Sequence, residues 1–336
     1  MAEKHTRVVS GIRSTGNLHL GNYIGALRQA AKMQHDYECY YFIADYHSLT
    51  THPSKDDFHK GVRQVMVECL ASGIDPDKAT LYVQSDVPEI PEFYLLLNML
   101  AHTGELERCT SFKEKVREQP DNVNAGLLTY PVLMAADILI HHGEKVPVGR
   151  DQEQHLEMAR DFARRFNHMY NVNLLPEPQA FNYEEVLVKV PGLDGSGKMS
   201  KSYGEHNAIF LTDDDKTIRK KIMRAVTDSG PTEPNQEKSE AVQNLFDLMS
   251  HVSSEDTIQY FDEQYNSCQI RYGDFKKQIA ADMQSFIAPL RERIQEIEAD
   301  EEYLKKVARR GAEKARESAA ETVKNVRNAI GIQPLY

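Results

Sequence analysis

Short runs of apolar and β-branched residues alternate with helical patterns up to about residue 190. We predict strands at residues 6–10, 39–43, 80–83 and 146–148. Between these runs, apolar residues recur at the spacing of amphipathic helices. The alternation predicts an α/β fold, in which a parallel sheet carries helices on its faces.

From about residue 206 the pattern is almost wholly helical, and Gly230-Pro231 and Pro234-Asn235 separate its first helix from its second. We predict helices near residues 215–227, 237–251, 255–266, 273–298 and 300–330. A chain of 336 residues is long enough for two domains. We therefore expect a sheet domain over residues 1–205, with a helical insertion at about 86–145, and an all-helical C-terminal domain over residues 206–336.

Polar and glycine residues follow several of the predicted strands, at 11–22, 45–47 and 149–152. In a parallel sheet, ligands bind beyond the carboxyl ends of the strands. We expect one cleft to collect these three segments.

Composition narrows the class of protein. A hydrophobic fraction of 40% and a charged fraction of 27% are those of a soluble globular protein. No apolar stretch approaches the roughly 18 residues that span a bilayer, and the chain starts in a strand-like run instead of a signal-peptide core. The cysteines, Cys39, Cys69, Cys109 and Cys268, have no zinc-binding spacing. We expect a cytoplasmic protein with free, mostly buried thiols, no metal site of its own and no membrane partner.

The formal net charge of −11 argues against a protein that coats nucleic acid indiscriminately. Two basic runs remain, at residues 216–224 and 305–316. At helical spacing each run could follow a phosphate backbone, and each could equally be a solvated helix face.

The loop from Thr15 to Asn22 carries Gly16 and Gly21 just before a predicted helix. Backbone N–H groups and the positive end of the helix dipole attract an anion at such a turn. His19 and Asn22, three residues apart, would add neutral donors on one side of the opening turn. A tight strand-to-helix turn requires glycine in any case, so the loop alone is a modest indication of a phosphate site.

A second glycine-rich segment, Gly192 to Lys198, matches the GxxxxGK pattern of P-loop proteins. A P-loop requires Ser or Thr at the next position to hold magnesium, and this chain has Met199 there. The alternatives are a flexible basic surface loop and a mobile loop that closes over ATP. In the latter, Lys198 and Lys201 would stabilise the charge on departing pyrophosphate, and the glycines would supply the hinge.

Residues 127–139 predict a helix with Pro131 in its first turn. Tyr130, Met134 and Asp137 share one face of this helix. Because an unpaired buried charge is costly, Asp137 should meet a donor. That donor could be a structural Arg, a backbone amide or a ligand.

Together the motifs resemble those of class I aminoacyl-tRNA synthetases. His19-Leu20-Gly21-Asn22 matches the HIGH motif, and Lys198-Met199-Ser200-Lys201-Ser202 matches KMSKS letter for letter. Residues 130–139 and 146–152 resemble the bacterial-type tryptophanyl-tRNA synthetases, and the similarity extends over most of the chain.

The resemblance implies a Rossmann-like catalytic domain followed by a tRNA anticodon-binding domain, and it assigns roles to residues. The catalytic residues would be His19, Asn22, Lys198 and Lys201. ATP would lie along Arg13, Ser14, Thr15, Gly21, Asn22, Gly149, Arg150, Asp151, Val190, Lys198, Met199, Ser200, Lys201 and Ser202. Tryptophan would be bound by Val9, Gly11, His47, Tyr130, Met134, Asp137, Val146, Val148 and Gln152. In this set Asp137 would accept the indole N–H, while His47 and Gln152 would orient the amino and carboxyl groups. Many relatives have Gln at Arg13 and an acidic residue at Arg150, which leaves the roles of these two open.

The activity implied is activation of L-tryptophan with Mg-ATP, release of pyrophosphate, and transfer to the terminal adenosine of tRNA(Trp) by a homodimer. The insertion is too short for an editing domain, which a site that hydrogen-bonds a substrate N–H does not need. Three other classes remain open: a tyrosyl-tRNA synthetase, a P-loop phosphotransferase and a non-catalytic RNA-binding module.

Overall fold

The computed structural model describes residues 6–14, 16–149, 152–181, 183, 190–195, 197–201 and 204–335. Four predicted site residues, Thr15, Arg150, Asp151 and Ser202, lie outside this described part.

The described residues contain a parallel sheet of five strands in the order β3-β2-β1-β4-β5, which confirms the predicted sheet. The strands are β1 (Arg7–Arg13), β2 (Glu38–Ala44), β3 (Thr80–Val83), β4 (Lys145–Val146) and β5 (Gln179–Ala180). Three strands differ from the prediction. β1 ends at Arg13, three residues after the predicted end at residue 10. β4 ends at Val146 because Pro147 has no N–H to continue the ladder, and β5 is an exposed two-residue strand with no apolar pattern.

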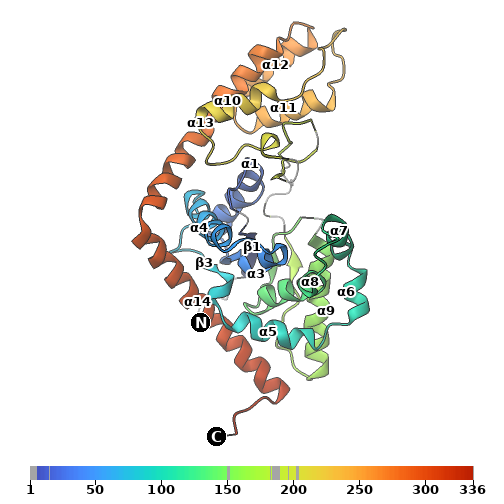
Figure 1. The fold of residues 1–336 in the computed structure, drawn as a ribbon, viewed down its shortest axis with the longest axis vertical. Coiled ribbons are helices and arrows are strands. Elements are labelled where there is room, and N and C mark those ends of the chain that lie inside the picture. Colours follow the sequence, from blue (N-terminus) through green and yellow to red (C-terminus); the bar gives the residue numbers. More distant parts are fainter. Residues whose placement is uncertain are drawn as a thin grey trace.

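Helices cover both faces of the sheet (Figure 1). They are α1 (Leu20–Asn22), a π-helical turn (Tyr23–Leu27), α2 (Arg28–Met33), α3 (Asp45–Ser48), α4 (Lys55–Ala71), α5 (Glu89–Asn98), α6 (Thr103–Arg108), α7 (Thr110–Glu118), α8 (Ala125–Leu139) and α9 (Glu153–Met169). Successive residues of β2 enter opposite cores: Tyr40, Phe42 and Ala44 on one side, Cys39, Tyr41 and Ile43 on the other. Because strand side chains alternate with a period of two, this central strand is buried on both faces.

Helix α8 begins earlier than predicted. Asn124 caps it by accepting a hydrogen bond from the backbone N–H of Leu127 at 3.2 Å. Pro131 therefore lies inside the helix and not in its first turn, so the expectation for Pro131 was wrong. Its buried ring packs where an N–H would otherwise bond the carbonyl of Leu127.

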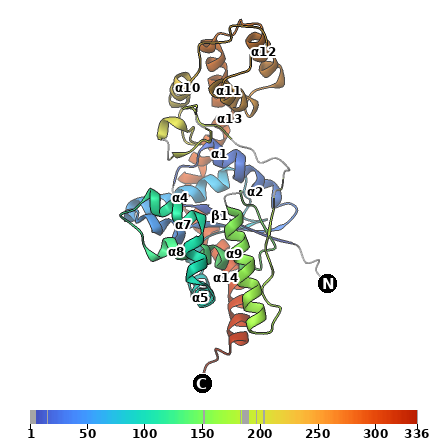
Figure 2. The same ribbon diagram turned by 90° about the vertical axis from the view of Figure 1, so that its right-hand side faces the viewer.

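The C-terminal part is helical, as predicted, with α10 (Asp215–Arg224), α11 (Glu240–Ser250), α12 (Glu255–Asn266), α13 (Tyr272–Ala299) and α14 (Glu301–Ile330). Its first three helices gather at one end of the molecule, and the chain ends at the opposite end (Figure 2). These helices and the first half of α13 share one hydrophobic core, which includes Ile218, Phe246 and Phe275.

Helix α14 returns to the sheet. Ala315, Ala319 and Val323 belong to the same core as β2 and α8. At Gly311 the helix approaches β3 so closely that an added Cβ would lie 1.7 Å from the carbonyl oxygen of Leu81. The domain division at residue 205 stays a prediction, and the packing of α14 shows that the last helix shares its core with the sheet.

Within the described ranges no helix is long and apolar enough to cross a membrane. The same part of the chain has no cluster of three or more His, Cys, Asp or Glu side chains that could hold a metal ion. The cysteines are free, with Cys39, Cys69 and Cys109 buried and Cys268 exposed.

Candidate active site

A cavity of about 250 Å³ lies at the carboxyl ends of β1, β2 and β4. Every predicted tryptophan-binding residue except Asp137 lines it, and the predicted ATP-binding residues Arg13 and Gly149 lie in its wall. The wall also contains Ser10, Phe42, Ala44, Ile138 and Pro147, which the sequence did not single out.

Gly11 is needed for the shape of this cavity. A Cβ at this position would lie 2.5 Å from the ring of Phe42 on the neighbouring strand. The absent side chain therefore lets the Phe42 ring lie across β1 and form part of the wall.

Asp137 is fully buried and is held by two side chains. Nε2 of His47 lies 2.8 Å from its Oδ2, and Nε2 of Gln84 donates to its Oδ1 at 2.7 Å. Burial raises the pKa of Asp137 above its ordinary value, although the hydrogen bonds from His47 and Gln84 favour the charged form. The donors are neither an Arg nor a backbone amide, so both structural alternatives for its partner were wrong.

Gln84 is a site residue that the sequence analysis missed. It is fully buried, and its Oε1 accepts a hydrogen bond from the backbone N–H of Tyr46 at 3.1 Å. It directly follows β3. The rule that directed attention to residues 45–47 after β2 would have found Gln84 as well.

His19 caps α1. The backbone N–H of Asn22 donates to Nδ1 of His19 at 3.2 Å, and Oδ1 of Asn22 accepts from the backbone N–H of His19 at 3.0 Å. Burial, together with the positive charges of Lys201 and Lys198, lowers the pKa of His19 to about 4. The imidazole is therefore neutral near pH 7, and its remaining ring N–H, at Nε2, is a donor.

Helix α4 supports the loop before His19. Oε2 of the fully buried Glu68 accepts a hydrogen bond from the backbone N–H of Leu18 at 2.8 Å. A Cβ at Gly61 would lie 2.3 Å from the carbonyl oxygen of Ser14, whose hydroxyl donates to Ser48 at 2.8 Å. Glu68 was missed, although a carboxylate within the apolar run of residues 65–71 was a usable signal.

The described residues of the second signature motif, 198–201, differ in their burial. Met199 is buried with Leu20 and Ile24, and its N–H donates to the carbonyl oxygen of Val190 at 2.9 Å. Lys198 is exposed, Ser200 is half-buried, and Nζ of Lys201 donates to the carbonyl oxygen of Gly16 in the first signature loop. The structure thus brings the two motifs into contact.

The glycines of this segment have different roles. Gly195 has a φ of +81°, in the left-handed region, whereas a Cβ at Gly192 would lie 2.2 Å from Oδ1 of Asn207. Gly197 has no neighbour within 4 Å of such a Cβ. Close packing at Gly192 does not fit the hinge that we expected there.

A larger cavity of about 880 Å³ adjoins both motifs. Its walls include Gly16, Asn17 and Lys201, and three further cations, Lys60, Arg63 and Lys221. Backbone amides of a glycine turn together with ammonium groups form a suitable environment for phosphates.

Residues 1–288 match the family model described as tRNA synthetases class I (W and Y). The tryptophan–tRNA ligase of Porphyromonas gingivalis is 63% identical over 326 residues, which cover 97% of this chain and 99% of that protein. The tryptophan–tRNA ligase of Rhodopirellula baltica is 42% identical over 328 residues, or 97% and 100% of the two chains. The crystal structure of tryptophanyl-tRNA synthetase from Campylobacter jejuni, complexed with ADP and tryptophan, has a TM-score of 0.86 at 35% identity and covers 97% of this chain and 100% of that one. From the motifs, the fold and these similarities, we conclude that the chain belongs to the bacterial tryptophanyl-tRNA synthetases, in the class I tRNA synthetase family.

Proposed function

We propose that the protein is a tryptophan–tRNA ligase that uses the cavity of about 250 Å³ for L-tryptophan and the region between the two signature motifs for ATP. The observation that carries this proposal is the cavity of about 250 Å³, which we call the amino-acid cavity. Its walls are apolar, and His47 in its wall is bonded to the buried Asp137. A small cavity with apolar walls and few polar groups suits a flat, apolar side chain with one N–H.

The indole ring would pack against Val9, Met134, Val146 and Val148, with its N–H directed to Asp137. Each carboxylate oxygen has two acceptor lone pairs, so a bond from His47 or Gln84 leaves acceptor capacity for the ligand. Nδ1 of His47 is buried and has no hydrogen-bond partner in the described part of the chain. Because His47 also lines the cavity, a ligand amino group would satisfy this atom.

Adenylate formation requires one displacement. An oxygen of the tryptophan carboxylate attacks the α-phosphorus of ATP, the bond from this phosphorus to the bridging oxygen breaks, and pyrophosphate leaves with the electron pair. Neutral His19 and the Asn22 amide supply donors at the first loop, and Lys198 and Lys201 stabilise the leaving charge. Mg²⁺ would enter with the substrate as Mg-ATP, held mainly by the phosphates.

In the second step a ribose hydroxyl of the terminal tRNA adenosine attacks the carbonyl carbon of the adenylate. The new ester forms as AMP leaves with the electron pair of the broken anhydride bond, and the hydroxyl proton passes to solvent. No protein side chain becomes covalently attached in either step, so positioning and charge stabilisation are the whole contribution of the protein.

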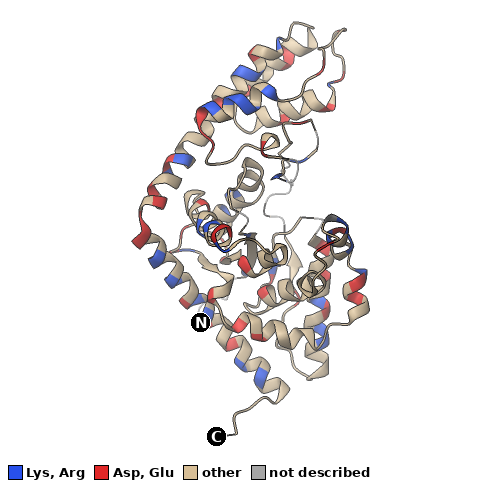
Figure 3. Ribbon diagram, viewed as in Figure 1, with Lys and Arg blue, Asp and Glu red and all other residues tan. Residues whose placement is uncertain are grey.

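Of the two basic runs, the one on helix α10 is the better candidate for a tRNA contact (Figure 3). Lys216, Arg219, Lys220 and Arg224 are exposed on it. In the α14 run, Arg310 forms an ion pair with Asp77. Part of that run therefore fixes α14 to the sheet domain, whereas the α10 cations remain at the surface for a phosphate backbone.

We also infer that the protein works as a homodimer. Leu95 and Met99 on and just after α5 are 55% and 72% exposed, and Leu49 is 45% exposed. Leu49 and the α5 residues Pro91 and Tyr94 line a further cavity of about 400 Å³. Exposed apolar side chains of this kind fit a second copy of the chain. Sedimentation of wild type against Leu95→Glu would show whether the dimer depends on them.

Amino-acid-dependent ATP–pyrophosphate exchange tests the function. The wild-type protein should support exchange with tryptophan and with none of the other standard amino acids at equal concentration, and it should release AMP when tRNA(Trp) is charged. Exchange with tyrosine instead would indicate a tyrosyl-tRNA synthetase. Release of ADP would indicate a phosphotransferase, and no exchange with any amino acid would indicate a non-catalytic RNA-binding protein.

A further inference from the structure

His155 is a buried residue of α9 that the sequence analysis did not single out. Both of its ring nitrogens are engaged. Nδ1 lies 2.8 Å from Oε1 of Gln152, and Nε2 lies 2.6 Å from Oγ of Ser111. Gln152 lines the amino-acid cavity, whereas His155 is outside its wall.

The chemistry of the partners fixes the tautomer of His155. The amide oxygen of Gln152 can only accept, so Nδ1 of His155 carries the proton. Nε2 is then unprotonated and accepts the hydroxyl proton of Ser111. This arrangement fixes which way the Gln152 carboxamide faces.

The same imidazole also supports Tyr130. The rings of Tyr130 and His155 meet edge-on, with centroids 5.2 Å apart and an interplanar angle of 69°. Tyr130 also meets His47 edge-on, with ring centroids 4.8 Å apart and an interplanar angle of 71°. His155 therefore contacts two cavity residues that come from different parts of the chain, Tyr130 from α8 and Gln152 from the start of α9.

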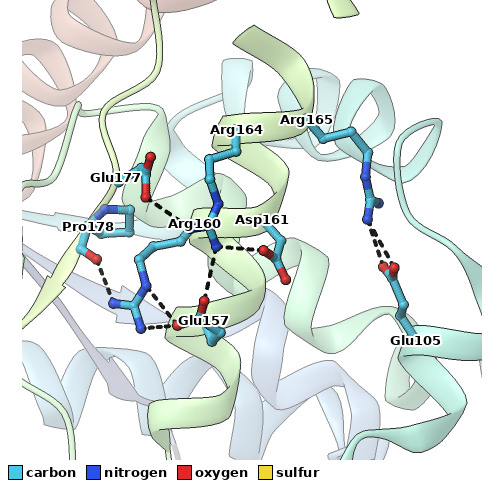
Figure 4. Close-up of polar contacts among 8 residues, drawn as sticks. All are labelled: Glu105, Glu157, Arg160, Asp161, Arg164, Arg165, Glu177 and Pro178. Atoms are coloured by element: carbon cyan, nitrogen blue, oxygen red, sulfur yellow. Dashed lines mark hydrogen bonds and ion pairs between the residues drawn. The ribbon is translucent and has the colours of Figure 1, made fainter. Parts of the chain in front are cut away.

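Helix α9 is joined to neighbouring segments by the polar contacts that Figure 4 shows. Arg165 bonds both carboxylate oxygens of Glu105 on α6, at 3.0 and 3.1 Å. Arg160 donates to the carbonyl oxygen of Pro178 at 2.9 Å, just before β5. These contacts fix α9 to α6 and to the segment before β5, so His155 keeps its position relative to the cavity.

We propose that His155 is a positioning residue for amino-acid recognition, which acts by orienting the Gln152 carboxamide and the Tyr130 ring toward the substrate. This inference rests on the proposed function, because it assigns the cavity to tryptophan. His155 touches neither substrate, and its effect passes through Gln152 and Tyr130.

Two substitutions of similar size separate this role from space filling. In His155→Asn the amide nitrogen can take the place of Nδ1 and still donate to Gln152. In His155→Gln the amide group extends toward Ser111, and the donor to Gln152 is lost. We expect His155→Gln to raise KM for tryptophan about two- to tenfold, the usual effect of losing one neutral hydrogen bond, and His155→Asn to raise it less. KM for ATP should be unchanged in both.

A double-mutant cycle with Gln152→Ala gives the decisive comparison. If His155 acts through Gln152, the difference between His155→Gln and His155→Asn disappears when Gln152 is already Ala. Equal effects of the two His155 variants, or a difference that persists in the Gln152→Ala background, would overturn the proposal. If the His155 variants fail to fold, Ser111→Ala replaces them in the cycle, with a smaller rise in KM that should also vanish without Gln152.

The wild-type exchange assay keeps this test distinct from that of the function. Absence of tryptophan-dependent exchange in wild type refutes the proposed function itself. Normal wild-type exchange combined with independent effects of His155 and Gln152 refutes only the positioning role.

Discussion

Nε2 of His47 lies 2.8 Å from Oδ2 of Asp137, and this bond joins a residue of the cavity wall to a fully buried carboxylate. Gln84 occupies the other oxygen of Asp137. Recognition of an indole N–H by Asp137 therefore depends on two neighbours that keep the carboxylate in place and favour its charged form.

Asp137→Ala should lower kcat/KM for tryptophan far more than it changes KM for ATP. A lost hydrogen bond to a charged group costs roughly 1.5–3 kcal/mol, which corresponds to a tenfold to more than hundredfold loss. Exchange kinetics with each substrate varied separately give both values. Asp137→Asn is the matched control for size, and unchanged tryptophan kinetics in a folded Asp137→Ala protein would refute the indole assignment.

Lys198→Ala and Lys201→Ala should slow adenylate formation with little change in tryptophan affinity, because their charges act mainly as pyrophosphate departs. Loss of one preorganised charge-stabilising group typically costs on the order of 10² to 10³ in rate. Single-turnover kinetics separate this step from binding. Lys220→Ala, an exposed lysine of α10, is the control and should leave the step unchanged. Weaker tryptophan binding with normal single-turnover chemistry would contradict the assigned role.

Glu68→Gln should change how stability depends on pH. Burial raises the pKa of Glu68 from 4.5 to about 7, against hydrogen bonds from Leu18 and Gln64. The folded protein thus keeps a proton that the unfolded chain has already lost, so the stability contribution is full below pH 4.5 and declines as pH rises toward 7. Relative to Glu68→Gln, wild type should lose about 3 kcal/mol across this window. Urea unfolding of both proteins at several pH values measures the difference, and parallel pH profiles would show that Glu68 has an ordinary pKa.

Gly311→Ala should destabilise the protein although alanine is the better helix former by about 1 kcal/mol. The new Cβ would meet the carbonyl oxygen of Leu81 and push α14 away from β3. Gly273→Ala on α13 is the control, since nothing lies within 4 Å of its added Cβ. Thermal unfolding compares the two, and a Gly311→Ala protein as stable as wild type would contradict the close docking of α14.

The sequence predicted the strands and helices with strong local patterns. β2 is an uninterrupted apolar run after Glu38, and its predicted range was close to the observed one. α12 has both a Ser254 cap and a clear period, and its predicted range was identical. β5 could not be predicted, because a two-residue exposed strand exists only through its pairing with β4. The first residue of α8 was not predicted because the Asn124 cap determines where the helix begins. The pattern of apolar residues carries no information on such a cap.

The residues of the candidate site also fall into those that the sequence predicted and those that it did not. Residues within a signature motif, and the segments after β1, β2 and β4, were found from the sequence. Gln84 and Glu68 were missed although each left a signal, the first directly after β3 and the second as a carboxylate in an apolar run. His155 was missed because its role depends on Ser111 and Tyr130, which come from other segments of the chain. Met199 is the apolar residue of its motif, and its side chain is buried with Leu20 and Ile24.

The chain contains no tryptophan, so selectively excited indole fluorescence in a titration can come only from the ligand. This makes tryptophan binding the most direct test of the central claim. Water should largely leave the ring when it packs against Val9, Met134 and Val146, so bound tryptophan should emit at shorter wavelength and the change should saturate with protein concentration. Tyrosine should compete poorly, because its hydroxyl cannot place a donor where the indole N–H meets Asp137. An emission spectrum that never changes with a folded, ATP-binding protein, or displacement of tryptophan by an equal concentration of tyrosine, would contradict the account.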